Sequence, residues 1–269
     1  MTERAPSQVL TLLARLVEER TGLHYSDRDR DLFEQKLTDH AAEEGYPTLL
    51  ELYYALRYDD PECEVLDRVI EALVVGETYF FREARGLEVL IEPLVARARR
   101  GERVRIWSAA CATGEEPISI AILLDRAGVL DRVELVATDI SARALDRARR
   151  GEHTRRAHRA VPEGMPPWIR VEHDRALVDE RLRARIDWRR VNLADEAAIA
   201  ALGRFDAIVC RNVLIYFDDA RIQRVAGSLA RALEPGGELL IGASESLLRF
   251  GSVFRCVERG GVFLYGVSS

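Results

Sequence analysis

Residues 104–139 read VRIWSAACATGEEPISIAILLDRAGVLDRVELVATD, and this stretch decides the fold. A short β-rich run over 104–109 is followed by a loop of small residues and then by a helical pattern over 116–127. A second β-rich run, 133–139, is followed by another helical pattern over 141–150. Strands that alternate with helices form a parallel sheet with helices on both faces, so this order predicts an α/β domain.

The second half of the chain continues this alternation, with a helix expected over about 219–233. The last two β-rich runs are joined by Gly260 and Gly261, and this glycine turn predicts an antiparallel hairpin at one edge of the sheet. The predicted fold is therefore a Rossmann-like sheet that is mostly parallel, with an antiparallel C-terminal hairpin. The expected later strands are IDWRRVN, FDAIVCRNVLIYF, GELLIGASE, FRCVER and GVFLYGV.

Residues 1–73 have a different pattern, in which apolar side chains recur at helical spacing. This pattern predicts a small all-α domain at the N-terminus. Residues 74–86 interrupt the helical period with a glycine and several aromatics, and we interpret them as a connector. The period resumes at 87–98, so residues 87–269 form the predicted α/β domain. The helices expected in the first domain are 7–20, 32–41, 49–56 and 64–73.

The composition is that of an ordinary soluble protein. The chain of 269 residues is 48% hydrophobic and 31% charged, and no window approaches the ~18 uninterrupted apolar residues that a membrane span needs. The first residues, MTERAPSQVLTLLARL, lack the basic, apolar and small-residue order of a signal peptide. We therefore expect a cytoplasmic protein with no membrane insertion. We also expect a monomer, since the sequence contains no long heptad pattern.

The cysteines and histidines indicate neither a disulfide scaffold nor a metal site. The four cysteines are widely spaced without a C-x-x-C pair, and we interpret them as reduced thiols. No histidine lies at zinc-ligand spacing from them, and all five histidines are expected at the surface. These residues are Cys63, Cys111, Cys210, Cys256, His24, His40, His153, His158 and His173.

The charge is unevenly distributed along the chain. The formal net charge of −6 argues against nucleic acid as the main partner, because phosphate binding needs concentrated positive charge. Residues 143–190, however, contain fourteen arginines against eight acidic residues. This stretch is either a solvated surface or a docking face for an acidic partner, and the sequence leaves both interpretations open.

Ligands of doubly wound sheets bind beyond the carboxyl ends of the strands. After the first strand, Gly114 permits a tight turn, and Glu115 and Glu116 begin a helix. Two carboxylates would repel a phosphate, and the loop matches neither G-x-G-x-x-G nor the P-loop, so a cationic cofactor such as S-adenosylmethionine suits it better. Asp139 ends the second strand, where such folds place an acceptor for ribose hydroxyls. The alternatives are helix-dipole stabilisation for the glutamates and a helix cap for Asp139.

Five motifs follow one another at familiar separations: ETYFFRE, WSAACATGEEPISIA, ATDIS, VNL and FDAIVCRNVLIYF. Through them the sequence resembles the chemotaxis receptor glutamate O-methyltransferase family (CheR) over nearly its whole length. The resemblance implies a class I methyltransferase sheet, a small N-terminal all-α domain and a small β-subdomain inserted at about 162–187. It also implies an S-adenosylmethionine-dependent enzyme that methylates glutamates on the cytoplasmic helices of methyl-accepting chemotaxis receptors and releases S-adenosylhomocysteine.

The resemblance also implies roles for individual residues. Arg82 would pair with the cofactor carboxylate, Glu116 would face the cofactor amino group, and Asp139 would hold the ribose. Asn192 and Leu193 would border the adenine, while the stretch from Cys210 to Tyr216 would close over the reacting methyl group. The implied catalytic residues are Arg82, Arg211 and Tyr216, and the implied cofactor-binding residues are Gly76, Thr78, Arg82, Glu116, Asp139, Asn192, Leu193, Cys210 and Arg211.

The chemistry of esterification agrees with a motif set that contains no general base. A glutamate carboxylate, with a reference pKa of about 4.3, is already a nucleophile at neutral pH. Positioning and exclusion of water should therefore dominate catalysis.

Three residues depart from the family pattern. Gly76 replaces an asparagine of some members, Ile118 replaces a common tyrosine, and His153 replaces an aromatic residue. The arginine-rich stretch 162–187 corresponds to a subdomain that grips a receptor C-terminal peptide in some members, and whether it does so here stays open.

Two other functions compete with receptor methylation. One is methylation of RNA, which only the basic stretch encourages, since no N/D-P-P-[YF] motif is present. The other is a non-catalytic adaptor that retains the fold and senses the cofactor. The complete set of motif residues argues against an adaptor.

Overall fold

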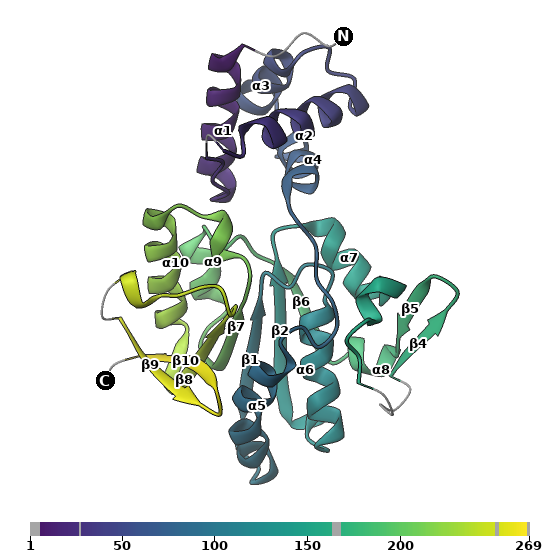
Figure 1. The fold of residues 1–269 in the computed structure, drawn as a ribbon, viewed down its shortest axis with the longest axis vertical. Helices are drawn as coiled ribbons and strands as arrows, with labels where there is room; N and C mark the ends of the chain where they lie inside the picture. The colour runs from purple at the N-terminus through teal and green to yellow at the C-terminus, as the bar shows by residue number, and fades with distance from the viewer. Residues whose placement is uncertain (1–5, 27, 163–167, 251–252, 268–269) are drawn as a thin grey trace. The chain divides into compact units, whose positions relative to one another are not determined.

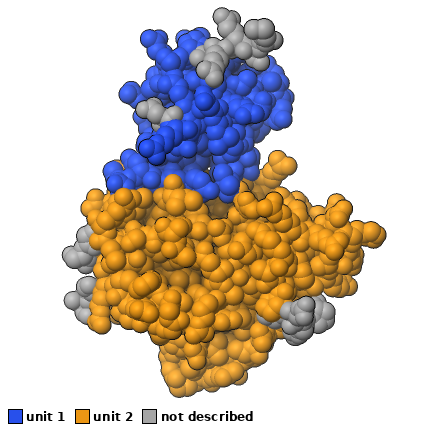
Figure 2. Space-filling model, in the orientation of Figure 1, with its two compact units in different colours: residues 1–75, 216–221 blue, residues 76–215, 222–269 orange. Residues whose placement is uncertain are grey.

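The computed structural model describes residues 6–26, 28–162, 168–250 and 253–267. The chain divides into two compact units (Figures 1 and 2). The first comprises Met1–Val75 with Tyr216–Arg221, and the second comprises Gly76–Ile215 with Ile222–Ser269. No helix among the described residues is both long and apolar enough to cross a bilayer.

The first unit is helical, as its apolar spacing predicts. Its core contains one fully buried leucine from each of the first three helices, Leu13, Leu37 and Leu52. The helices have local end signals: α1 ends at Gly22, which has a left-handed φ of 82°, and the Thr48 side chain caps α3. The helices are α1 (Ser7–Thr21), α2 (Arg30–Glu43), α3 (Leu49–Tyr58) and α4 (Glu64–Leu73).

The second unit contains a seven-stranded sheet in the order β6-β2-β1-β7-β8-β10-β9. The pairs from β6 to β8 are parallel, while β10 runs antiparallel to both β8 and β9. The predicted mostly parallel sheet with a C-terminal hairpin is thus confirmed. The strands are β1 (Val104–Ala109), β2 (Val133–Asp139), β6 (Ile186–Arg190), β7 (Phe205–Cys210), β8 (Leu233–Ile241), β9 (Phe254–Arg259) and β10 (Val262–Val267).

The central strands β1, β2 and β7 are buried on both faces of the sheet, to which successive residues of a strand point in turn. Ile106 of β1 belongs to the core that α5 and α6 share, whereas its neighbour Trp107 is fully buried and lies 5.5 Å from the Phe205 ring. Near-continuous apolar strands are typical of parallel sheets covered on both faces. The helices are α5 (Ala84–Arg99), α6 (Glu115–Arg126), α7 (Ala142–Arg150), α8 (Glu180–Arg183), α9 (Glu196–Ala201) and α10 (Asp219–Arg231).

A second, three-stranded antiparallel sheet has the order β3-β5-β4. Its strands are β3 (Glu152–Thr154), β4 (Ile169–Glu172) and β5 (Arg175–Val178). This sheet begins before the predicted insertion at 162–187, and residues 186 and 187 belong to β6 of the main sheet. Residues 163–167 of the predicted insertion lie outside the described residues. The three-residue β3 is too short to show a recognisable alternation in sequence.

The prediction that all five histidines lie at the surface is wrong for two of them. His40 is 7% exposed in the core of the first unit, where burial lowers the pKa of its imidazole. His153 is 2% exposed on β3. The four cysteines are free thiols, as predicted.

Candidate active site

Three loops meet at the carboxyl edge of the main sheet. The strands β2, β1 and β7 lie side by side and end in register, since Ala109 pairs with Thr138 on one side and with Cys210 on the other. The loops that begin at Ala110, Ile140 and Arg211 therefore start next to one another. This edge is where ligands bind in open α/β sheets.

The loop between β1 and α6 has an unusual backbone. Ala110, Ala112 and Gly114 all have positive φ values, of 56°, 47° and 92°. The Ala112 N–H donates to Asp139 Oδ2 at 2.7 Å, so the neighbouring strand end holds the turn. A Cβ on Gly114 would lie 2.7 Å from the Ala148 Cβ and 2.8 Å from the Trp188 ring. Gly114 is therefore required by both its conformation and its close packing.

The first glutamate of the motif, Glu115, is buried. Its carboxylate accepts a hydrogen bond from Thr113 Oγ1 at 2.7 Å and lies 2.9 Å from His153 Nδ1. Burial raises the pKa of Glu115, but the hydrogen bonds from His153 and Thr113 outweigh it and leave the pKa below its usual value. His153 also packs edge-on against Phe80 at 4.8 Å. Glu115 thus links the loop, α6 and the small sheet.

The second glutamate, Glu116, is bound to Arg211. Arg211 Nε donates to Glu116 Oε2 at 2.7 Å, and Ser108 Oγ donates to Glu116 Oε1 at 2.7 Å. The Arg211 side chain is 2% exposed, and its Nη1 donates to the Arg82 carbonyl at 2.7 Å. The structure therefore brings together two residues that the motifs predict for one site. Arg211 is a buried partner of Glu116 here.

Asp139 connects two backbone segments. Besides Ala112, it accepts the Ser141 N–H at 2.9 Å through Oδ1, as expected of a residue that precedes a helix. Its carbonyl accepts the N–H of Val191, so the segment after β6 lies beside it. Asn192 and the buried Leu193 follow in that segment. Both carboxylate oxygens of Asp139 therefore bind backbone N–H groups of the loops that follow β1 and β2.

The connector motif is anchored through its backbone. The Phe81 N–H donates to Ser119 Oγ at 2.9 Å, and the Phe80 N–H donates to the Ala157 carbonyl at 3.0 Å. Arg82 is half-buried, with Nη1 donating to the Glu77 carbonyl at 3.3 Å.

The remaining predicted residues have mixed surroundings. Thr78 is half-buried, Gly76 is exposed, and a Cβ on Gly76 would meet nothing within 4 Å. Cys210 is fully buried at the end of β7, and burial raises the pKa of its thiol well above the usual value. Tyr216 belongs to the first unit, so its catalytic role stays a prediction.

Some side chains that shape this edge were not predicted from the sequence. Ser108 binds Glu116, Ser119 binds the connector, and Glu245 accepts hydrogen bonds from the backbone after β7. The expected strand GELLIGASE ends at Ile241, and FDAIVCRNVLIYF ends as a strand at Cys210. A polar residue just beyond a strand end was the signal available for Glu245.

The hydrogen-bond acceptors at this edge suit a cationic ligand that carries hydroxyl groups. The strand-end side chains Glu116 and Asp139 are carboxylates, which accept hydrogen bonds from ammonium and hydroxyl groups. These features fit S-adenosylmethionine, which combines ammonium, sulfonium and ribose hydroxyl groups.

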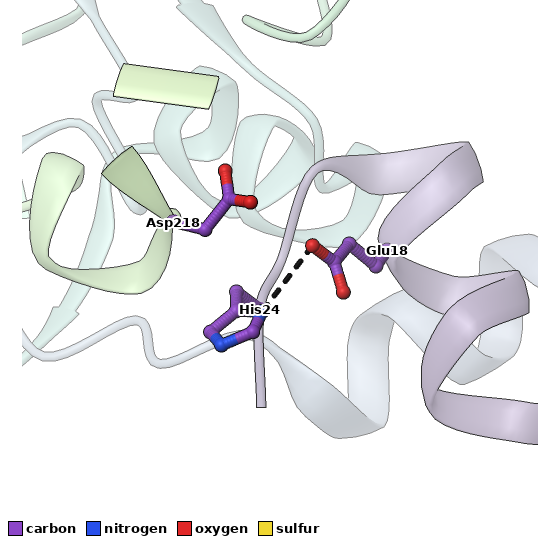
Figure 3. A group of neighbouring side chains, drawn as sticks. All are labelled: Glu18, His24 and Asp218. Atoms are coloured by element: carbon purple, nitrogen blue, oxygen red, sulfur yellow. Dashed lines mark hydrogen bonds and ion pairs between the residues drawn. The ribbon is translucent and has the colours of Figure 1, made fainter. Parts of the chain in front are cut away.

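Three metal-ligand-type side chains of the first unit lie near one another: Glu18, His24 and Asp218 (Figure 3). One ligand atom of each lies within 4.8 Å of the others. His24 Nδ1 lies 3.2 Å from Glu18 Oε1, and Asp218 Oδ1 accepts the Arg221 N–H at 2.7 Å near the start of α10. A partly exposed hydrogen-bonded pair and a helix-end acceptor account for the group without an ion.

The sheet order and the antiparallel hairpin define a Rossmann-like sheet with carboxylates at its strand ends. Residues 76–262 match the family model described as the CheR methyltransferase, SAM binding domain. The chain belongs to the CheR methyltransferase family, and its cofactor is S-adenosylmethionine.

Curated relatives extend this similarity over most of the chain. Chemotaxis protein methyltransferase 2 of Vibrio cholerae serotype O1 is 36% identical over 251 residues, which are 88% of this chain and 84% of the relative. Chemotaxis protein methyltransferase 1 of Pseudomonas aeruginosa is 32% identical, over 90% of this chain and 91% of the relative. Among solved structures, the SAM-bound magnesium protoporphyrin IX methyltransferase of Synechocystis PCC 6803 is 16% identical with a TM-score of 0.35, over 77% of this chain and 91% of that one.

Proposed function

We propose that this chain is a protein-glutamate O-methyltransferase of chemosensory signalling. It transfers the methyl group of S-adenosylmethionine to glutamate side chains on the cytoplasmic helices of methyl-accepting chemotaxis receptors and forms glutamyl methyl esters. The observation that carries the proposal is the family match over residues 76–262, which includes the strand-end edge and its carboxylates. We place the reaction in the cytoplasm and expect a monomeric enzyme.

The residues around the strand ends have separate roles toward the cofactor in this proposal. Glu116 accepts from the ammonium group, Asp139 accepts from the ribose hydroxyls, and Arg82 binds the carboxylate end together with Thr78. Asn192 and Leu193 border the adenine, while Gly76 and Cys210 line the site through backbone and a buried thiol. When bound, the cofactor supplies an electrophilic methyl group on a positively charged sulfur.

The protein positions the reactants and moves no proton. The substrate carboxylate is ionised at neutral pH, because its reference pKa is about 4.3. The buried pair of Glu116 and Arg211 keeps an acidic acceptor fixed at the cofactor, which favours electrostatic preorganisation. Arg211 therefore serves catalysis by holding Glu116, while Arg82 and Tyr216 help to orient the incoming glutamate.

Two linked measurements test this function. Calorimetric titration with S-adenosylhomocysteine measures cofactor binding by the purified chain. Methyl transfer from radiolabelled S-adenosylmethionine is then compared on receptor cytoplasmic fragments and on RNA. We expect binding and label on the receptor fragments alone. Label on RNA would favour the nucleic-acid alternative, and binding without transfer would favour an adaptor.

A further inference from the structure

Glu245 lies in the turn after β8 and accepts three backbone hydrogen bonds. Its Oε2 accepts the N–H groups of Gly242 and Asn212 at 2.8 Å each, and its Oε1 accepts the N–H of Leu214 at 2.9 Å. Hydrogen bonds to an ionised carboxylate are stronger than those between neutral groups. One side chain from the loop after β8 therefore fixes the backbone of the loop after β7.

The backbone that Glu245 holds includes a left-handed residue. Asn212 has a φ of 57°, a conformation that asparagine adopts more readily than most side chains but that is still uncommon outside glycine. The two loops are also packed without spare room, since a Cβ on Gly242 would lie 2.8 Å from both Asn212 Nδ2 and Glu245 Oε2. The left-handed conformation of Asn212 is thus fixed by the surrounding groups from several sides.

This backbone carries Arg211 directly before Asn212. The Arg211 guanidinium donates to Glu116 Oε2 and to the Arg82 carbonyl, both at 2.7 Å, and it is 2% exposed. Such a pair has little freedom to follow a moving backbone, because hydrogen-bond strength falls steeply with geometry. A shift of the loop after β7 would separate Arg211 from Glu116.

We propose that Glu245 is a positioning residue of the methyl-transfer site. Its carboxylate fixes residues 212–214 and thereby holds Arg211 against Glu116, which is the acceptor at the cofactor. This inference rests on the proposed function of the site. The three hydrogen bonds of Glu245 go to backbone N–H groups and not to the side chains of Arg211 or Glu116. Glu245 therefore acts through the backbone.

The test is the isosteric substitution Glu245→Gln. Glutamine keeps one acceptor oxygen but turns an NH₂ group toward at least one backbone N–H, so the bonds to Asn212 and Leu214 cannot both remain. Hydrogen exchange on the cofactor-free chain should show faster exchange at one or both of these amides. S-adenosylhomocysteine should bind about tenfold more weakly, since small misplacements in a preorganised site have large effects. Glu245→Asp, one methylene shorter, should give an intermediate affinity.

A double-mutant cycle with Arg211→Ala separates positioning from general damage. In that background, Glu245→Gln should weaken S-adenosylhomocysteine binding by less than about twofold, because the residue through which it acts is already missing. Equal losses in both backgrounds would overturn the proposal. So would unchanged exchange at Asn212 and Leu214 in the single variant.

Asp206→Asn is the matched control. Asp206 lies near the opposite end of β7, where its carboxylate accepts the Arg105 N–H at 2.8 Å and binds Arg97 at 2.7 Å. This variant should lose stability while keeping cofactor affinity and slow exchange at Asn212. Hydrogen exchange and S-adenosylhomocysteine affinity are measured without a receptor. Failure of receptor methylation would therefore count against the proposed function, whereas these two measurements decide the role of Glu245.

Discussion

Two adjacent glutamates of one motif differ because of what surrounds them. Glu115 is bound to Thr113 and His153, whereas Glu116 is bound to Ser108 and Arg211. The first fixes the loop to the small sheet, and the second presents an acceptor at the strand edge. At the residue scale, the hydrogen-bond partners of each glutamate decide its role, and its position in the motif does not.

Replacing His153 with phenylalanine should preserve packing on Phe80 and remove a partner of the buried Glu115 carboxylate. The expected loss is about 1–3 kcal/mol of unfolding free energy at neutral pH. Because the folded pKa of Glu115 lies below its unfolded value of 4.5, its stabilisation is present above that pH and is lost as pH falls through the folded pKa. Urea unfolding at neutral pH and at about pH 4 should show a smaller acid-induced loss in His153→Phe than in the natural chain.

The half-buried His158 provides the control for this measurement. His158→Phe should change the unfolding free energy by no more than about 0.5 kcal/mol at either pH. Identical pH profiles for His153→Phe and the natural chain would contradict the assigned pairing.

Asp139→Ala should weaken S-adenosylhomocysteine binding by about 1–3 kcal/mol, because it removes both the expected ribose acceptor and the anchor of Ala112. Calorimetry measures this change. Asp146→Ala, which removes an exposed ion pair with Arg149 on α7, should leave the affinity as it is. Unchanged affinity in Asp139→Ala would remove that residue from the site.

At the residue scale, the motifs predict residues that the structure places at the strand ends, while their roles toward the cofactor stay predictions. Glu116, Asp139 and Arg211 stand in motifs at strand ends, and Glu116 and Arg211 are in direct contact. The buried state of His153 was not predictable, since it depends on a three-residue strand that brings the ring to Glu115. The role of Glu245 was hidden because all three of its hydrogen bonds go to backbone groups of other segments or of its own turn.

At the scale of the element, periodicity predicts the middle of helices and strands better than their ends. VRIWSA and VELVATD are strands over the predicted residues, and Glu64–Leu73 is a helix as expected. The strand expected through Glu245 stops at Ile241 because Gly242 turns the chain and its N–H donates to the Glu245 side chain. The local sequence pattern does not reveal that a side chain will bind the backbone N–H groups in this way.

The turn between β1 and α6 makes a prediction for this scale. Gly114→Ala should lower stability by about 1–3 kcal/mol and weaken S-adenosylhomocysteine binding, because the added Cβ meets Ala148 and Trp188 in a left-handed turn. Thermal unfolding and calorimetry measure the two effects.

Gly128→Ala is the matched control for that turn. Gly128 has a φ of 70°, but a Cβ there would meet nothing within 4 Å. Gly128→Ala should therefore lower the unfolding free energy through backbone strain and leave the cofactor affinity unchanged. Equal effects of the two substitutions on affinity would show that close packing at Gly114 does not matter to the site.

At the scale of the whole molecule, the two compact units have separate cores. Leu37 is fully buried in the core of the first unit, and Leu87 is fully buried in the core of the second. From the sequence we expect a helical domain over 1–73, a connector over 74–86 and an α/β domain over 87–269, in which strands alternate with helices from about residue 103.

Separate cores predict separable effects of core substitutions. Leu37→Ala should lower the unfolding free energy by about 2–5 kcal/mol and leave S-adenosylhomocysteine affinity unchanged, since all the proposed cofactor-binding residues belong to the second unit, which keeps its own core. Leu87→Ala should lower both stability and affinity. Calorimetry combined with thermal unfolding tests this, and loss of affinity in Leu37→Ala equal to that in Leu87→Ala would contradict the division.

Esterification of receptor glutamates is tested by the chemical stability of the transferred label. Receptor cytoplasmic fragments are methylated with radiolabelled S-adenosylmethionine. One portion is exposed to mild base, and the peptides of an untreated portion are mapped by mass spectrometry. The account predicts label that base releases as methanol and that maps to glutamate side chains. Label that survives base, or that maps to residues other than glutamate, would contradict it.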